Sequence, residues 1–201
     1  LLSLSKKNVH NAAALVADYT TGEILAWVVG GVGNKKLKTP ALEIDTVTSP
    51  RQPGSAMKPF LYAMAIDKGW TAATILDDSP FAEAVGNGLH NFRNYSNIYY
   101  GKITLREALG NSLNIPALLA IHYVGTESYL MHLQKLGFKS LGLGAEVYDE
   151  GLALGNGEVT LLEMVEAYAA LANGGYRVEA HLVREVKRVS GEIIEQPEPL
   201  R

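Results

Sequence analysis

Apolar positions near the start of the chain predict a β-hairpin followed by a buried helix. Two short apolar runs, residues 13–17 and 23–29, flank a polar turn that ends at Gly22, and this arrangement is typical of a hairpin. The longer apolar run at residues 60–66 is followed by Gly69. Because Gly often ends a helix, the run predicts a buried helix that stops near Gly69.

Helix-start signals predict the elements that follow. Thr104 with Glu107, and Thr160 with Glu163, have the spacing of capping boxes, in which each side chain bonds the backbone N–H of the other residue. We expect the central helices at residues 104–109, 116–124, 126–136 and 160–172. Residues 182–196 then alternate apolar and polar around a Ser-Gly turn, which predicts a terminal hairpin.

The pattern of apolar and polar positions is weakest between the first predicted helix and residue 104. Residues 79–101 are rich in Gly and Asn and predict an irregular segment beside the site. For Tyr95, Tyr99 and Tyr100 we expect packing in a hairpin or loop, and the alternative is contact with substrate. Asp77 and Asp78 suit a turn better than catalysis. Strands, then helices, then strands again indicate an α+β layered domain.

One short motif carries candidate chemistry at the start of the first helix. Ser55-Ala56-Met57-Lys58 follows the turn-forming run Arg51-Gln52-Pro53-Gly54 and precedes the buried helix. At positions i and i+3, the Ser55 hydroxyl and the Lys58 amine share one helix face, so that Lys58 can take the Ser55 proton if burial lowers its pKa.

The tetrapeptide alone is weak, because such a spacing arises about once by chance in a chain of this length. Ser3-Leu4-Ser5-Lys6 also fits, and we interpret it as part of a polar entry segment. The structural alternative for Ser55 is a helix cap beside a Lys58 that faces solvent.

A second motif lies in a predicted connection between helices. Ser112-Leu113-Asn114 follows the first capping-box helix and precedes Pro116, which suits the first turn of the next helix. There, the Ser112 hydroxyl can relay a proton and the Asn114 carboxamide can hold a peptide. Alternatively, both residues cap helix ends. The two motifs in this order favour an acyl-transfer site.

Longer segments around these motifs resemble the transpeptidase domains of penicillin-binding proteins, over most of residues 12–195. Residues 51–60 are similar to the nucleophile segment of that family and residues 105–117 to its second segment. Leu152-Ala153-Leu154-Gly155, residues 159–164 and residues 167–175 resemble a third stretch of the class A, bifunctional group. Within class A, the sequence Lys58-Pro59-Phe60-Leu61-Tyr62 favours the penicillin-binding protein 1C-like subgroup.

The resemblance implies a fold and an activity. The fold is the penicillin-binding and serine β-lactamase-like one, with an antiparallel sheet flanked by helices and a helical lobe. The activity is a peptidoglycan D,D-transpeptidase, in which Ser55 forms an acyl-enzyme with stem peptides or β-lactams. Lys58 and Ser112 would be catalytic, Asn114 would bind substrate, and no cofactor is implied. The resemblance also implies a parent protein with a glycosyltransferase domain and a membrane anchor. We expect that protein to lie on the extracytoplasmic face of the bacterial membrane.

The sequence departs from the family pattern at one motif. No Lys-Thr-Gly follows Ser112-Leu113-Asn114, and Lys38-Thr39-Pro40 precedes the nucleophile and has a proline where an N–H is needed. With Leu1 first and no signal peptide, we expect residues 1–201 to form a partial domain, with a first hairpin at 12–30, a nucleophile helix and helical lobe at 55–175 and a terminal hairpin at 180–196. Its sheet would be unfinished, which predicts poor solubility or a missing complementary segment. The open alternatives are a D,D-carboxypeptidase or β-lactamase, and a non-catalytic β-lactam sensor or scaffold.

Composition excludes other classes of function. The chain of 201 residues is 47% apolar, has a formal charge of −3 and contains no Cys. Because no basic stripe is present, nucleic acid is not an expected partner. The five His residues show no metal-ligand spacing, so we predict no metal site.

Overall fold

The computed structural model describes residues 7, 9, 11–30, 44–85 and 88–195. The tetrapeptide at 3–6, the Lys-Thr-Pro at 38–40 and residue 196 of the predicted terminal hairpin lie outside this part. The chain divides into two compact units. The first contains 1–51, 135–140 and 159–201, and the second contains 52–134 and 141–158. The division into segments 12–30, 55–175 and 180–196 stays a prediction.

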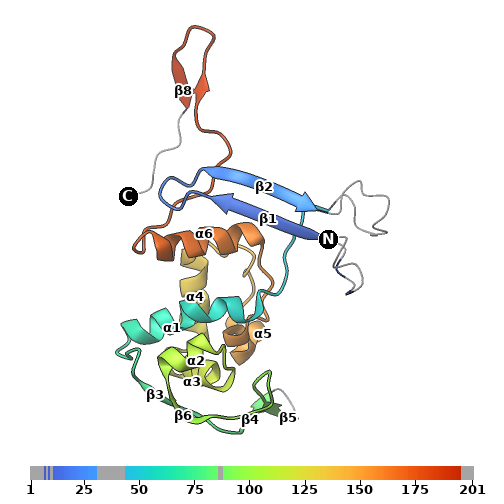
Figure 1. The fold of residues 1–201 in the computed structure, drawn as a ribbon, viewed down its shortest axis with the longest axis vertical. Helices are drawn as coiled ribbons and strands as arrows, with labels where there is room; N and C mark the ends of the chain where they lie inside the picture. Colours follow the sequence, from blue (N-terminus) through green and yellow to red (C-terminus); the bar gives the residue numbers. More distant parts are fainter. Residues whose placement is uncertain (1–6, 8, 10, 31–43, 86–87, 196–201) are drawn as a thin grey trace. The chain divides into compact units, whose positions relative to one another are not determined.

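The first unit contains the predicted opening hairpin. Strands β1 (Ala12–Ala17) and β2 (Ile24–Gly30) pair antiparallel, with Leu15 opposite Trp27. The turn between them is fixed by Asp18, whose carboxylate accepts hydrogen bonds from the backbone N–H groups of residues 20 and 21. Helix α6 (Leu161–Ala172) packs along β1 (Figure 1).

Helix α6 begins where the sequence predicted, because its capping box forms. The Thr160 N–H donates to the Glu163 carboxylate at 2.8 Å, and the Glu163 N–H donates to the Thr160 hydroxyl at 3.1 Å. The same carboxylate accepts the N–H of Ser140 at 2.8 Å. The predicted terminal hairpin is shorter than expected, with β7 (Val186–Lys187) paired to β8 (Ile193–Glu195).

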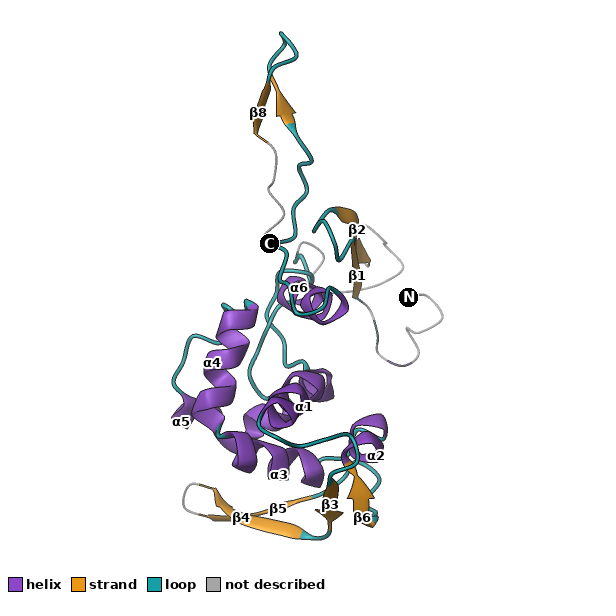
Figure 2. Cartoon of the chain, turned by 90° about the vertical axis from the view of Figure 1, so that its left-hand side faces the viewer, coloured by secondary structure: helices purple, strands orange, loops and turns teal. Residues whose placement is uncertain are grey.

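The second unit is a group of helices with short strands (Figure 2). Its elements are the 3₁₀ helices η2 (Gly54–Met57) and η3 (Asp149–Leu154), the helices α1 (Lys58–Asp67), α2 (Leu105–Gly110), α3 (Ile115–Val124) and α5 (Ala145–Tyr148), and strands β3 (Ile75–Asp78), β4 (Phe81–Val85), β5 (Gly88–Phe92) and β6 (Gly101–Thr104). Helix α4 (Thr126–Leu136) begins here and ends in the first unit.

Apolar helix faces form the core of the second unit. Helix α1 packs on α3, and α3 packs on η3. Phe60, Leu118, Ile121 and Tyr129 have no exposed surface. Because α3 buries most of its side chains, it has no polar face of the kind that surface helices show. Among the described residues, no helix has both the length and the apolar character required to cross a bilayer.

Two predictions for the second unit are wrong. The segment 79–101 contains the antiparallel hairpin β4–β5 and the start of β6, which pairs with β3. Asp77 and Asp78 therefore lie in a strand, and Asp78 is completely buried. The β3–β6 pairing joins residues far apart in the sequence, so no local turn signal announces it. Helix α5 and η3 were not predicted either.

Candidate active site

Ser55 lies in the turn that leads into α1. Gly54, with a φ of +59°, allows the sharp change of direction, and η2 then continues into the helix. The Ser55 side chain is exposed, in contrast to Met57 and Lys58. The predicted helix start is confirmed, with Ser55 in a 3₁₀ turn before the α-helix proper.

Gly155 supports this turn from η3. The Gly54 N–H donates to the Gly155 carbonyl at 3.3 Å, and Gly155 has a φ of +75°. A Cβ atom on Gly155 would collide with the backbone oxygen and nitrogen of Gly54. Gly is therefore required at 155 both for its conformation and for the close approach of two backbones.

Lys58 is fully buried and connects the two motifs of the sequence. Its Nζ donates to the carbonyls of Ser112 at 2.7 Å and Leu113 at 3.0 Å, and to Oδ1 of Asn114 at 2.8 Å. An ammonium group has three hydrogens, so all are directed at the 112–114 segment. The structure thus excludes the alternative of a Lys58 that faces solvent.

Burial lowers the pKa of Lys58 from 10.5 to about 8. The cause is desolvation, which penalises the charged form, although three oxygen acceptors act in the opposite direction. At pH 7 such a lysine is neutral about one time in ten, roughly 300-fold more often than at its ordinary pKa. A neutral amine at this position can accept a proton.

Ser112 adopts an unusual backbone conformation for a side chain with a Cβ atom. Its φ is +54°, in the left-handed region, and its side chain is exposed. The N–H groups of Ser112 and Leu113 close the end of α2 by donating to Leu109 and Ala108, both at 3.0 Å. The carbonyls of the same two residues accept from Lys58. Strained residues of this kind concentrate at functional sites.

Asn114 is held at both its backbone and its side chain. Its N–H donates to Oδ1 of Asn94 and its Nδ2 donates to the Arg93 carbonyl, each at 2.8 Å, while its Oδ1 accepts from Lys58. Among the described residues, one carboxamide hydrogen and one oxygen lone pair of Asn114 then have no partner. These can serve an amide of a bound peptide.

The structure brings three of the four predicted residues into direct contact, and Ser55 lies three residues before Lys58. Within the described ranges, the hydroxyls of Ser55 and Ser112 form no hydrogen bond, so both are free to approach a ligand. Hydrogen bonds between catalytic groups often tighten only when substrate binds. Described residues contain no cluster of three or more metal-binding side chains. The arrangement combines a base, two hydroxyls and a carboxamide.

Sequence reasoning missed two polar residues beside this site. Asp78 and Asn94 are almost completely buried, at 0% and 3% exposure, and Asn94 contacts Asn114 directly. Neither residue belongs to a recognisable motif, and Asn94 was one of several asparagines in a segment predicted to be irregular. Gly155, in contrast, belonged to a recognised stretch, but its contact with Gly54 was not foreseen.

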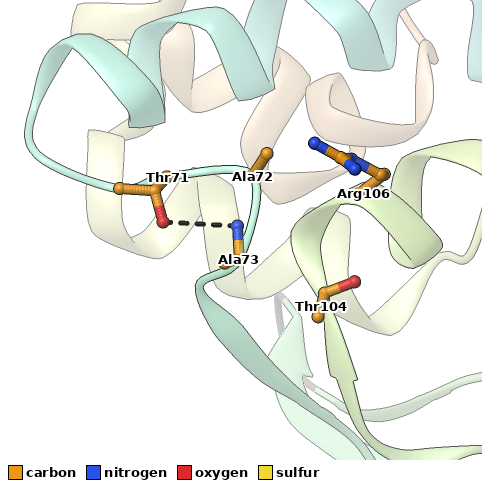
Figure 3. Close-up of a pocket in the computed structure, with 5 residues that line it drawn as sticks. All are labelled: Thr71, Ala72, Ala73, Thr104 and Arg106. Carbon is orange, nitrogen blue, oxygen red and sulfur yellow. Dashed lines mark hydrogen bonds between the residues drawn. The ribbon is translucent and has the colours of Figure 1, made fainter.

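A separate small pocket of about 320 Å³ lies in the second unit (Figure 3). Its lining residues come from the loop before β3 and from the junction of β6 and α2: Thr71, Ala72, Ala73, Thr104 and Arg106. The Thr71 hydroxyl accepts the N–H of Ala73 at 3.3 Å. None of the four predicted site residues lines this pocket.

Comparison with known proteins identifies the family. The family model described as penicillin binding protein transpeptidase domain matches residues 12–201. Penicillin-binding protein 1A of Neisseria meningitidis is 35% identical over 191 residues, covering 93% of this chain and 23% of that protein. The chain therefore spans less than a quarter of the length of such relatives. The relatives carry the name 1A and give no support to the 1C-like subgroup.

Solved structures agree with this assignment. The crystal structure of penicillin-binding protein 1A from Haemophilus influenzae has a TM-score of 0.80 and 33% identity, and covers 94% of this chain and 27% of its own. An imipenem acyl-enzyme complex of penicillin-binding protein A from M. tuberculosis has a TM-score of 0.76 and 20% identity. The match covers 92% of this chain and 51% of that protein's chain. Both confirm the predicted α+β transpeptidase fold. The chain belongs to the family of penicillin-binding protein transpeptidase domains, in its class A group.

Proposed function

We propose that this chain provides the acyl-transfer site of a peptidoglycan D,D-transpeptidase. Ser55 is the nucleophile, Lys58 and Ser112 move protons, and Asn114 holds the donor peptide. The observation that carries the proposal is the buried Lys58, whose Nζ reaches all three residues of the second motif. Membership of the transpeptidase family supports the same reading.

The proposed reaction begins with neutral Lys58. Its amine takes the Ser55 proton while Oγ attacks the carbonyl carbon of the penultimate D-Ala. The C–N bond to the terminal D-Ala then breaks, and the proton passes from Lys58 through the Ser112 hydroxyl to the departing amine. An amine from a neighbouring peptidoglycan strand then attacks the ester carbonyl, the C–O bond to Ser55 breaks, and the proton that the amine loses returns to the Ser55 oxygen through Lys58. A β-lactam contains a strained amide that presents the same kind of carbonyl, so it would acylate Ser55 as well.

Asn114 orients the substrate in this scheme. Its remaining carboxamide hydrogen can donate to a substrate carbonyl and its remaining lone pair can accept a substrate N–H. Because Lys58 and residue 93 already fix the carboxamide, little rotamer freedom is lost when the peptide binds.

The proposal includes the cellular setting that the class A resemblance implies. The domain would act on the extracytoplasmic face of a bacterial membrane, in a protein that also has a glycosyltransferase domain and a membrane anchor. Stem peptides of peptidoglycan and β-lactams are the proposed partners, and the scheme needs no metal or cofactor.

Intact mass after incubation with a penicillin tests the nucleophile. Wild type should gain the mass of one drug molecule, and Ser55→Ala should gain none. Ser190→Ala is the matched control, because Ser190 is also exposed but lies in the β7–β8 turn. A Ser55→Ala variant that still gains the drug mass would refute the assignment.

Product analysis separates the proposed transpeptidase from its alternatives. A stem peptide ending in D-Ala-D-Ala is supplied with and without an acceptor amine, to this chain and to the longest gene product that contains it. Cross-linked product indicates a transpeptidase, whereas free tetrapeptide with no cross-link indicates a carboxypeptidase. If neither protein forms an adduct or a product, the non-catalytic alternative is favoured.

A further inference from the structure

Asn94 is a buried carboxamide whose hydrogen-bonding groups all have partners. Its Nδ2 donates to both oxygens of Asp78, at 2.8 and 2.9 Å, and to the Ile98 carbonyl at 2.9 Å. Its Oδ1 accepts the N–H of Asn114 at 2.8 Å. The amide has only one acceptable orientation, because a flip would turn its oxygen toward a carboxylate and its NH₂ toward an N–H donor.

Asp78 fixes Asn94 through its Nδ2, whereas Asn114 binds its Oδ1. The carboxylate is completely buried and also accepts the N–H of Tyr100 at 2.9 Å. Buried polar groups are costly unless they are satisfied, and a satisfied network specifies one arrangement of its members. Asp78 therefore holds the Asn94 carboxamide so that its oxygen points at Asn114.

The network continues without interruption from Asp78 to Lys58. Asp78 accepts from Asn94, Asn94 accepts from the Asn114 N–H, and Asn114 accepts from the Lys58 Nζ. The neighbouring carbonyl of Arg93 holds the Asn114 side chain as well. Asn94 thus holds the backbone of Asn114, and the Arg93 carbonyl holds its carboxamide.

We propose that Asn94, oriented by Asp78, is a positioning residue for acyl transfer, which acts on Lys58 and on the bound peptide by fixing Asn114. This inference rests on the proposed function, and it assigns no contact between Asn94 and substrate. We expect loss of Asn94 to lower the rate of acylation, because Asn114 binds the Lys58 amine and has one carboxamide hydrogen and one lone pair available for the peptide.

A double-mutant cycle tests whether the effect of Asn94 on acylation depends on Asn114. Asn94→Ala should lower the rate of penicillin acylation by about tenfold, as expected for the loss of a supporting hydrogen bond, with a smaller change in initial drug binding. Asn114→Ala keeps the backbone N–H that Asn94 binds but removes the carboxamide, so in that background the same change should have a clearly smaller effect. Multiplicative losses in the double variant would overturn the proposal, because they would mean that Asn94 acts independently of Asn114.

A stability control separates positioning from general loosening of the fold. Leu133→Ala removes a fully buried side chain of α4 that lies outside the network. It should destabilise the protein while its folded form acylates at the wild-type rate. Equal rate losses in Leu133→Ala and Asn94→Ala would overturn the proposal.

A reciprocal exchange covers the case in which Asn94→Ala does not fold. Asp78→Asn and Asn94→Asp each place mismatched groups in the network. When the two are combined, the new amide can donate to the new carboxylate, which can still accept the Asn114 N–H, and only the Ile98 carbonyl loses its donor. The combination should recover at least part of the acylation rate that each single variant loses. No recovery in a folded double variant would contradict the proposal.

The NMR signal of the Lys58 side chain, assigned by its loss in Lys58→Met, reports on the network without any reaction. It should move in Asn94→Ala and in Asn114→Ala, and stay in place in Leu133→Ala. An unmoved signal in Asn94→Ala overturns the positioning role. If this signal moves but neither this chain nor the longest gene product that contains it forms an adduct or a product, the proposed function fails and the link from Asn94 to Lys58 stands.

Discussion

The Nζ of Lys58 donates a 2.8 Å hydrogen bond to Oδ1 of Asn114, a residue 56 positions further along the chain. This contact joins the start of α1 to the connection between α2 and α3. Because Lys58 is buried at this contact, desolvation lowers the pKa of its amine.

The rate of penicillin acylation should rise with pH and level off above about 8. Burial lowers the pKa of Lys58 to about 8, and only the neutral amine can accept the Ser55 proton. Below that pKa the rate should fall about tenfold per pH unit. Stopped-flow measurements between pH 6 and 9.5 give the profile. A rate that still rises about tenfold per pH unit up to pH 9.5, as the ordinary lysine pKa of 10.5 would require, would contradict the role of burial.

Lys58 should also make stability depend on pH. Its pKa is lower in the folded than in the unfolded state, so between about pH 8 and 10.5 the unfolded chain binds more protons. The free energy of unfolding should therefore rise across this window, by on the order of 3 kcal/mol. Urea unfolding of wild type and Lys58→Met at each pH isolates this contribution. A constant difference between the two would exclude it.

Gly155→Ala should both destabilise the protein and slow acylation. The new Cβ would collide with the Gly54 backbone and displace the turn that presents Ser55. Gly174→Ala is the matched control, because Gly174 has a similar φ of +66° but open space around it. We expect a loss of about 1 kcal/mol in Gly174→Ala from backbone strain alone, and a larger loss in Gly155→Ala. Equal losses in thermal unfolding would argue against a collision.

Two substitutions at Ser112 should separate backbone strain from proton transfer. Ser112→Ala and Ser112→Gly both remove the hydroxyl, so both should slow acylation. Only Gly tolerates a φ of +54° without strain. Ser112→Gly should therefore be about 1 kcal/mol more stable than Ser112→Ala. The comparison needs chemical denaturation and acylation rates of both variants. If Ser112→Gly were less stable than Ser112→Ala, the result would contradict backbone strain at position 112.

The elements that the sequence predicted well depend on local chemistry. The capping boxes at Thr104 and Thr160 place the starts of α2 and α6, since each uses residues within one helical turn. The turn at Asp18 and Gly22 likewise fixes the first hairpin. Lys58 was found because the order of two family motifs compensated for the weakness of each.

The elements that were missed depend on contacts between distant residues. The sequence favours a turn at Asp78, yet this residue bonds to Asn94, 16 positions away, and lies in a strand whose partner begins at residue 101. No period or cap encodes such a pairing. The support of Gly54 by Gly155 is equally non-local, because two backbones meet there.

Peptide mapping of the penicillin adduct tests the central claim most directly. Trypsin cuts after Arg51 and Lys68, whereas Pro59 protects the bond after Lys58. The proposed mechanism predicts that wild type carries the drug on the peptide 52–68, with fragmentation locating it on Ser55. An adduct on the peptide 107–135, which contains Ser112, or on any other peptide would contradict it.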